Sequence, residues 1–358
     1  MEIDISIIIV NYNVRHFLRR TVESIYASDI AGLSIEIFVV DNASIDGSVE
    51  MVTSQFSDVH LIANQDNVGF STANNQAIAQ SKGKYVLILN PDTVIEEHTL
   101  GICHAYMERH MEVGAVGVRM IDGSGNFLAE SKRAIPTVWN SFTKLSGLSS
   151  WFPKSSLFNG YALGHLSEND THKIDVLCGA FMFVRRAAID KVGMFDERFF
   201  MYAEDIDWSR RIVEGGYEIH YIPDTTIIHY KGESTKKASL SYVKTFYGAM
   251  SLYVEKHYSG PSGKFFSKIL KLAITVRAAI SGLRRLVTEA IQPILDFALV
   301  FLGIYGFSKF WATWYFDDSL YYEDTNLLAY LLAYTSAWIV SLWLFGYYKK
   351  HWKKIWQV

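Results

Sequence analysis

Short apolar runs alternate with amphipathic stretches through the first 120 residues of the chain. Runs rich in Ile, Val and Leu, with little polar alternation, are typical of strands covered on both faces of a parallel sheet. Four such strands are predicted, at residues 3–10, 35–40, 59–63 and 85–89. Helices are predicted between them at residues 14–28, from Ser48 as the cap, and at 71–81. This order implies right-handed crossovers and an α/β fold with a doubly wound, mostly parallel sheet flanked by helices.

The pattern is less regular in the second half of the chain. Further elements are predicted as helices at 98–110, 186–192 and 208–215, strands at 114–120 and 218–222, and a strand pair within 174–184. Residues 122–173 contain Gly, Ser and scattered aromatic side chains without a clear period. Because a long irregular segment in a compact domain is often functional, this segment either contacts an acceptor substrate or is a surface insertion.

The chain changes character after Ser234. Residues 264–285 carry Lys and Arg at helical spacing among Leu, Ile and Val. This pattern predicts a basic amphipathic helix, at residues 259–290, that lies on an anionic membrane surface. The alternative is a helix that packs one face against the protein core.

Two longer apolar segments follow, at residues 294–316 and 326–348. Each is long enough, at ~1.5 Å per residue, to cross a hydrocarbon core of roughly 30 Å. Their outer flanks are basic and their connection is acidic, which predicts a transmembrane hairpin with both ends in the cytoplasm. Residues 291–358 would form this membrane domain, which leaves room for self-association or for partner subunits.

Composition narrows the function classes. A formal net charge of -3 gives no reason to expect nucleic-acid binding. The two cysteines, Cys103 and Cys178, are too few for a disulfide framework. The N-terminus lacks a basic leader with a cleavage site, so we expect no signal peptide and a cytoplasmic first domain. The chain also lacks a Gly-x-Gly-x-x-Gly motif and a P-loop, which argues against dinucleotide oxidoreductases and P-loop enzymes.

Polar residues follow three of the predicted strands. Asn11, Asp41 and Asp92 each stand where a strand ends, and the carboxyl ends of parallel strands meet at one edge of the sheet. Asn90 and Pro91 interrupt the fourth apolar run directly before Asp92. Asp92 alone could be an ordinary turn residue. At this edge, however, its carboxylate could also hold a divalent cation against a diphosphate.

A second group of charged residues comes later in the chain. Glu204, Asp205 and Asp207 precede a predicted helix, where acidic side chains also suit the helix dipole. Their mutual repulsion should raise the proton affinity of at least one of them, as a general base near neutral pH requires. His229 is either a metal ligand or a structural histidine.

Taken in order, these residues belong to motifs that resemble the inverting, GT-A fold glycosyltransferases of family 2. The similarity is greatest to the rhamnosyltransferase-like branch that builds bacterial surface polysaccharides. The motifs are Ile-Ile-Val-Asn-Tyr-Asn (8–13), Val-Val-Asp-Asn-Ala-Ser (39–44), Asn-Val-Gly-Phe-Ser-x-Ala-Asn (67–74), Leu-Asn-Pro-Asp (89–92), Gly-Ala-Phe (179–181), Gly-x-Phe-Asp (193–196), Phe-Met-Tyr-Ala-Glu-Asp-Ile-Asp (200–207) and His-x-x-Gly-x-Ser (229–234). Asn90 departs from the Asp-x-Asp metal motif that is common in the family. Asp92 therefore lacks the second carboxylate that would assist it in binding a metal.

The resemblance implies a nucleoside-diphosphate sugar as donor and Mg²⁺ or Mn²⁺ as cofactor, with Asp92 and His229 as metal ligands. It implies that the nucleotide sugar is bound by Asn11, Tyr12, Asn13, Asp41, Asn67, Gly69, Asn74 and Asn90. It further implies inversion in a single displacement, with Asp205 as the general base. The acceptor side would be supported by Gly179, Ala180, Glu204, Asp207 and Trp208, and Trp208 could stack on the acceptor sugar.

The whole chain is therefore expected to be a membrane-anchored glycosyltransferase of polysaccharide biosynthesis, with a lipid-linked (polyprenyl diphosphate) glycan as acceptor. Its GT-A domain would occupy residues 1–258, divided into a nucleotide-sugar half of about 1–120 and an acceptor half of about 121–258. This domain would face the cytoplasm at the inner membrane. An alternative from another class is a non-catalytic sugar-nucleotide-binding subunit or scaffold of a polysaccharide assembly complex.

Overall fold

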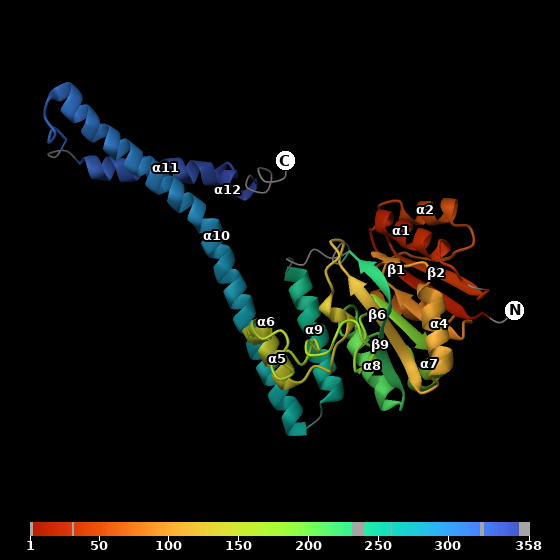
Figure 1. The fold of residues 1–358 in the computed structure, drawn as a ribbon. Helices are drawn as coiled ribbons and strands as arrows, with labels where there is room; N and C mark the ends of the chain where they lie inside the picture. Colours follow the sequence, from red (N-terminus) through yellow and green to blue (C-terminus); the bar gives the residue numbers. More distant parts are fainter. Residues whose placement is uncertain (1–2, 31, 231–239, 259, 323–325, 351–358) are drawn as a thin grey trace. The chain divides into compact units, whose positions relative to one another are not determined.

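The computed structural model describes the chain except residues 1–2, 31, 231–239, 259, 323–325 and 351–358 (Figure 1). The chain divides into two units, Met1–Leu270 and Lys271–Val358. Gly232 and Ser234 of the last motif lie outside the described residues, as do Lys353 and Lys354 of the basic tail.

The first four strands of unit 1 form the predicted parallel half of a sheet. They are β1 (Ile5–Asn11), β2 (Ile35–Asn42), β3 (His60–Asn64) and β4 (Tyr85–Leu89), in the order β3-β2-β1-β4. The connections contain α1 (Arg15–Tyr26), α2 (Ser48–Gln55) and α3 (Phe70–Ile78). All three strand pairings in this half are parallel, which confirms the expected βαβ architecture. Ser48 is the first helical residue of α2 and Gly47 is its cap, so the predicted cap was one residue late.

The remaining strands extend this sheet with mixed directions. The elements that follow are β5 (Thr93–Ile95), α4 (Thr99–Arg109), β6 (Val113–Ile121), η1 (Ala129–Ser131), α5 (Val138–Ser146), α6 (Leu148–Trp151), β7 (His172–Ile174), β8 (Phe181–Arg185), α7 (Arg186–Val192), α8 (Glu204–Glu214) and β9 (Glu218–His229). The strand order continues from β4 as β8-β6-β9-β5, and β7 pairs with β9. Of these pairings only β6 with β9 is parallel, so the expectation of a mostly parallel sheet holds only for the first half.

Two strand predictions in the second half need correction. The strand pair expected within residues 174–184 is not a hairpin, because β7 pairs with β9 whereas β8 pairs with β4 and β6. β9 does not stop at Ile222 but continues through Pro223 to His229. Pro223 is tolerated because it lies at a register shift between β9 and β6, where the ladder is interrupted.

Side chains cover the sheet on both faces. Ile5, Ile7 and Ile9 of β1 pack in one buried cluster, which also contains Leu18 and Leu100 from α1 and α4. Ile8 and Val10, which alternate with these residues along the strand, belong to a second cluster with side chains of α3, α7 and α8. Strands buried on both faces lose the apolar–polar alternation of a surface strand, as their sequence predicted.

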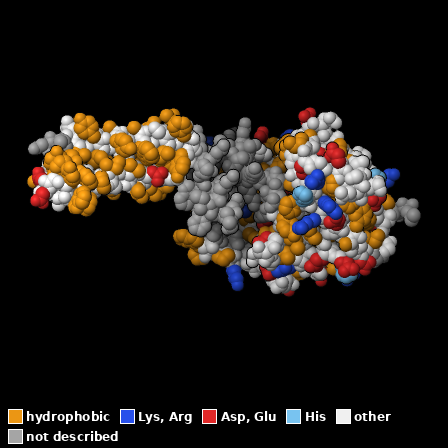
Figure 2. All heavy atoms as spheres, turned by 90° about the horizontal axis from the view of Figure 1, so that it is seen from above, with side chains coloured by type: hydrophobic (Ala, Val, Ile, Leu, Met, Phe, Trp, Pro, Cys, Tyr) orange, Lys and Arg blue, Asp and Glu red, His pale blue; other side chains and the backbone are white. Residues whose placement is uncertain are grey.

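In the part of the chain that the structure describes, four helices follow β9: α9 (Leu240–His257) in unit 1, then α10 (Gly260–Phe316), α11 (Leu327–Leu344) and α12 (Tyr347–Lys350). The separate helix expected at residues 259–290 is instead continuous with the first apolar segment, since Pro293 is accommodated within α10. The segments Ala290–Phe316 and Leu327–Leu344 are long and apolar enough to cross a membrane. Figure 2 shows hydrophobic side chains gathered over the surface of this apolar part.

Candidate active site

The ends of β1 and β2 are joined by a buried polar network. The Asn11 side chain donates from Nδ2 to Asp41 Oδ2 at 2.7 Å and to the Ser44 hydroxyl at 3.1 Å. The backbone N–H of Ser44 donates to Asp41 Oδ1 at 2.8 Å, and Asn13 donates its backbone N–H to the Ser44 hydroxyl. Asn11 and Asp41 are almost fully buried, whereas Tyr12 is exposed. The sheet edge thus brings together Asn11, Asn13 and Asp41, three of the residues expected to bind the nucleotide sugar.

The start of α3 lies against the loop that precedes α8. Gly69 has φ +87°, and its backbone N–H is held by the Asn67 side chain. Phe70 donates its backbone N–H to the Phe200 carbonyl at 2.7 Å. A Cβ at Gly69 would come within 2.6 Å of the same Phe200 carbonyl oxygen, so only glycine permits this approach.

Strand β1 and helix α3 both carry buried polar atoms without hydrogen-bond partners. Among the described residues, Asn11 Oδ1, Ser71 Oγ and Asn74 Oδ1 have no hydrogen-bond partner. Asn74 does use its amide nitrogen, which donates to the Phe70 carbonyl. Because buried polar atoms are usually paired, each of these atoms is available for a hydrogen bond to a polar ligand.

Asp92 and His229 are brought together by the β5–β9 ladder. Thr93 pairs with His229 in this antiparallel ladder, and Tyr230 donates its backbone N–H to the Asp92 carbonyl. The side chains therefore meet, with His229 Nε2 3.4 Å from Asp92 Oδ1, and both are more than nine-tenths buried. β5 itself was not predicted, because three residues are too few to show a period.

The turn at residues 178–180 connects the Asp92 region with Asp205. Asn90 donates its backbone N–H to the Ala180 carbonyl at 3.0 Å, and Gly179 donates its own to Asp205 Oδ2 at 3.2 Å. Two adjacent residues of one turn, Gly179 and Ala180, thus form hydrogen bonds to the first turn of α8 and to the Asn-Pro-Asp motif after β4, respectively. The structure places Asn90, Gly179, Ala180 and Asp205 in one neighbourhood, although they are up to 115 residues apart in sequence.

Arg133 is a residue of this site that sequence reasoning missed. Its guanidinium donates to Asp205 Oδ2 at 2.6 Å, to the Leu177 carbonyl, and to the Tyr161 hydroxyl at 3.4 Å. Burial alone would lower the pKa of Arg133, but the Asp205 carboxylate raises it well above its ordinary value. Arg133 stands in the irregular segment, where an isolated arginine carries no signal in the sequence.

Glu204 and Asp205 are neighbours with different surroundings. Asp205 Oδ1 accepts the backbone N–H of Ile206, so both of its oxygens are hydrogen-bonded, whereas Glu204 Oε2 has no partner among the described residues. Burial raises the pKa of Glu204 to about 8, and the Asp205 charge acts in the same direction. The proton affinity expected to rise within this acidic group is therefore that of Glu204.

The model of Glycosyl transferase family 2 matches residues 6–193, which is more than half of the chain. The chain belongs to glycosyltransferase family 2. Two described helices of this glycosyltransferase also meet the length and composition required to cross a membrane.

Similar proteins include rhamnosyltransferases. The N-acetylglucosaminyl-diphospho-decaprenol L-rhamnosyltransferase of Mycobacterium tuberculosis is 26% identical over 63% of this chain and 76% of its own length. Rhamnosyltransferase WbbL of Escherichia coli is 27% identical over 63% of this chain and 83% of its own length. Among solved structures, the mannosyltransferase PcManGT of Pyrobaculum calidifontis, in complex with GDP-Man and Mn²⁺, has a TM-score of 0.50. It is 16% identical, with 81% of each chain covered, and shows a shared GT-A fold.

Of the residues predicted on the acceptor side of this glycosyltransferase, Gly179 is partly exposed, whereas Ala180, Glu204, Asp207 and Trp208 are buried. Trp208 is fully buried, donates from its indole N–H to the Gly193 carbonyl at 2.9 Å and packs on Phe195. A ring in this position cannot stack on an acceptor sugar, so that expectation is wrong. Asp207 is also fully buried, and its carboxylate pairs with Arg211, Lys256 and His257.

Asp92 and His229 have the chemistry of a small metal site. A carboxylate and an imidazole are common ligands of Mn²⁺ and fit a divalent cation, and His229 Nδ1 has no partner among the described residues. The described part of the chain contains no group of three or more His, Cys, Asp or Glu side chains suited to one metal ion. Asp92 and His229 would supply two protein ligands, and further oxygen ligands would have to come from a bound diphosphate or from water.

Proposed function

We propose that this family 2 glycosyltransferase transfers a sugar, with inversion, from a nucleoside-diphosphate sugar to a lipid-linked glycan on the cytoplasmic face of the inner membrane. The observation that carries the proposal is the turn at residues 178–180, because it joins Asp205 to the segment that carries Asp92. A proton-accepting carboxylate and a candidate cation site thereby flank one location, as transfer from a diphosphate donor requires.

The donor would lie along the carboxyl edge of β1, β2 and β4. Asn11 and Asp41 would contact the nucleoside, with Tyr12 and Asn13 beside them, and the unpaired Asn11 Oδ1 is available for a hydrogen bond. Asn67, Gly69 and Asn74 would approach the ribose and the diphosphate, where the bare Gly69 backbone allows close contact. Asn90 would complete this set next to Asp92.

Asp92 and His229 would hold Mg²⁺ or Mn²⁺. The cation would supply charge neutralisation for the nucleoside diphosphate as it leaves. With Asn90 in the place of a second acid, the protein offers few anionic ligands, so we expect weak metal binding until a donor diphosphate is present.

Asp205 would act as the general base. The acceptor oxygen forms a bond to the anomeric carbon as the bond from that carbon to the diphosphate oxygen breaks, and the acceptor proton moves to Asp205. A carboxylate has about four acceptor positions, so its contacts with Arg133, Gly179 and Ile206 leave room for an acceptor hydroxyl. Arg133 would fix the orientation of the base.

The acceptor would reach Asp205 past the segment around α5 and α6. Arg133 and Tyr161 connect this segment to the base, and it exposes the aromatic side chains Trp139, Phe142, Trp151 and Phe152. A polyprenyl-linked acceptor cannot leave the bilayer, which accounts for a catalytic domain tethered to two apolar helices.

Incubation of the detergent-solubilised full chain with a panel of nucleotide sugars, membrane lipid extract and either Mg²⁺ or Mn²⁺ tests the proposal. We expect release of the nucleoside diphosphate from one donor, loss of this activity with EDTA, and incorporation of the sugar into lipid with inverted anomeric configuration. If no donor is consumed although nucleotide sugars bind, the non-catalytic subunit or scaffold is the better description.

A further inference from the structure

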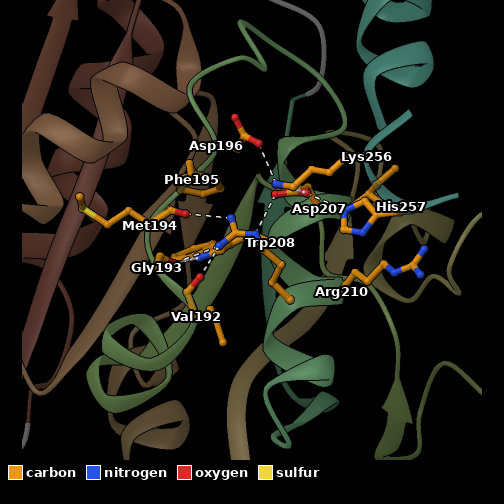
Figure 3. Close-up of polar contacts among 12 residues, drawn as sticks. Val192, Gly193, Met194, Phe195, Asp196, Asp207, Trp208, Arg210, Lys256 and His257 are labelled. Atoms are coloured by element: carbon orange, nitrogen blue, oxygen red, sulfur yellow. Dashed lines mark hydrogen bonds and ion pairs between the residues drawn. The ribbon is translucent and has the colours of Figure 1, made fainter. Parts of the chain in front are cut away.

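Helix α9 carries two basic residues at its C-terminal end that reach the buried Asp207 carboxylate. Lys256 Nζ lies 2.8 Å and His257 Nε2 lies 2.6 Å from Asp207 Oδ1, while Arg211 Nε donates to Oδ2 at 2.9 Å (Figure 3). Burial alone would raise the pKa of Asp207, but these partners together lower it. Asp207 is two residues from Asp205, so the contacts fix the helical turn that carries the proposed base.

Lys256 also contacts the loop that precedes α8. Its ammonium group lies 2.7 Å from Asp196 Oδ2, and the same loop supplies the Phe200 carbonyl that binds Phe70 beside Gly69. Lys256 thus bridges two carboxylates (Figure 3): Asp196, in the loop against the proposed donor site, and Asp207, at the start of α8 beside the proposed base.

Aromatic residues add two further contacts between the α9 region and the segments around Asp205. Phe246 of α9 packs edge-on against Tyr202 of the loop, with ring centroids 5.6 Å apart. Tyr258, directly after α9, donates its hydroxyl to the Pro136 carbonyl at 2.8 Å, three residues from Arg133. Helix α9 and Tyr258 directly after it therefore contact three segments near Asp205: the loop, α8 and the Arg133 segment.

Such a buried ionic cluster is better suited to fixing geometry than to adding stability. Desolvation of the charges offsets much of their attraction, so replacement by apolar side chains is often neutral for folding. The orientation of a reacting group is far more sensitive, since a shift of about 1 Å can cost roughly 10²-fold in rate.

We propose that Lys256 and His257 are positioning residues of the transfer reaction, which hold the Asp205 turn and the loop over the donor site in the reactive arrangement. The inference rests on the proposed function. Since α10 begins at Gly260, the same residues also connect the catalytic turn with the helix that leads into the first apolar segment.

The test compares Lys256→Met and Lys256→Arg in the full-length protein with Lys173→Met as matched control. Lys173 forms an exposed ion pair with Glu218 on β9, away from the cluster. We expect Lys256→Met to lower kcat by about tenfold or more with donor KM changed less than about threefold, and Lys256→Arg to restore most of kcat. Lys173→Met should match the wild type. His257→Ala should lower kcat in the same direction, because it removes the ring nitrogen that contacts Asp207 at 2.6 Å.

Hydrogen exchange of the peptides that cover residues 193–207 provides a second readout. Faster exchange in Lys256→Met, but not in Lys173→Met, is expected. A Lys256→Met protein that unfolds at lower temperature but retains normal kcat and exchange while folded would overturn the inference. If the wild type transfers no sugar from any donor, the proposed function fails, and the exchange data alone decide whether Lys256 holds this turn.

Discussion

At the residue scale, Asp205 is held by three hydrogen-bond donors from different parts of the chain. Arg133, Gly179 and Ile206 fix both of its oxygens, so its position is determined before any substrate binds. Glu204, its neighbour, is buried with a raised pKa and an oxygen without a partner among the described residues. Adjacent carboxyl groups in such different surroundings can serve different roles in one reaction.

We predict that Asp205→Asn lowers kcat by about 10² to 10⁴-fold, because the amide keeps the shape of the side chain but cannot accept the acceptor proton. Binding of the nucleoside diphosphate, measured by calorimetry, should change little. Glu23→Gln, which removes an exposed ion pair on α1, is the control and should keep wild-type turnover. Near-normal turnover of Asp205→Asn would assign the base to another group.

Arg133→Met should also lower kcat, since Asp205 loses its closest ionic partner, at 2.6 Å. Arg133→Lys keeps the charge but not the planar fork that reaches Asp205, Leu177 and Tyr161 together, so we expect only partial recovery. Single-turnover measurements at saturating donor would separate this loss from weaker donor binding. Equal activity of both variants and the wild type would exclude an orienting role.

At the scale of elements, the start of α3 and the loop before α8 form one functional surface. Their contact depends on a single position without a side chain, Gly69, and on a hydrogen bond between two backbones at Phe70 and Phe200. The proposed donor site would therefore be built from elements that are 130 residues apart. A change at Gly69 should act on both of them.

We predict that Gly69→Ala weakens donor binding and lowers the melting temperature more than Gly125→Ala does. Both glycines have similar positive φ values, +87° and +84°, so the cost of the left-handed backbone is shared. Only at Gly69 would the new methyl group meet a backbone oxygen, at 2.6 Å, whereas the Cβ of Gly125 would meet open space. Equal effects of the two substitutions on nucleotide affinity would show that the close approach is unimportant.

At the scale of the whole molecule, buried ion pairs link helix α9 to the rest of the catalytic domain. The Arg198 hydrogen bonds lower the pKa of Asp196 well below its ordinary value, and Lys256 acts in the same direction. The pKa of Asp207 is also lowered, despite burial, by Lys256, Arg211 and His257. These carboxylates remain ionised in the folded chain at pH values where the unfolded chain takes up protons.

We therefore predict that stability is lost as pH falls below the ordinary aspartate value of 3.8. In that window the unfolded state binds more protons than the folded state, so acid favours unfolding, while the contribution is fully present at neutral pH. Thermal unfolding followed by tryptophan fluorescence should show a decrease that begins as the pH is lowered from about 5 and continues below pH 3, toward the lowered pKa values of the folded state. Asp196→Asn should be less stable than the wild type at pH 7, and this difference should shrink at pH 3. An unchanged difference across that range would contradict the assignment.

The local pattern of the sequence determined most of the elements and much of the proposed site. Buried strands must be apolar and must end in polar turns, so β1, β2 and β4 and the residues that follow them were predictable. Asn11, Asp41 and Asp92 were placed on one edge because parallel strands end together. The two apolar helices were predictable as well, because length and composition alone define them.

Tertiary structure decided which side chains meet across long separations. Arg133 reaches Asp205 from an irregular segment, and Lys256 reaches Asp207 from a distant helix, although nothing near either residue in the sequence indicates its partner. Trp208 was expected at the acceptor surface, but the packing of α8 on the sheet buries it, since an aromatic residue in a sequence does not indicate its own exposure. The hydrophobic periodicity that defines a helix or strand is a local property, so it can be read from neighbouring residues. The partner of a buried charge, in contrast, is determined only when distant elements pack together.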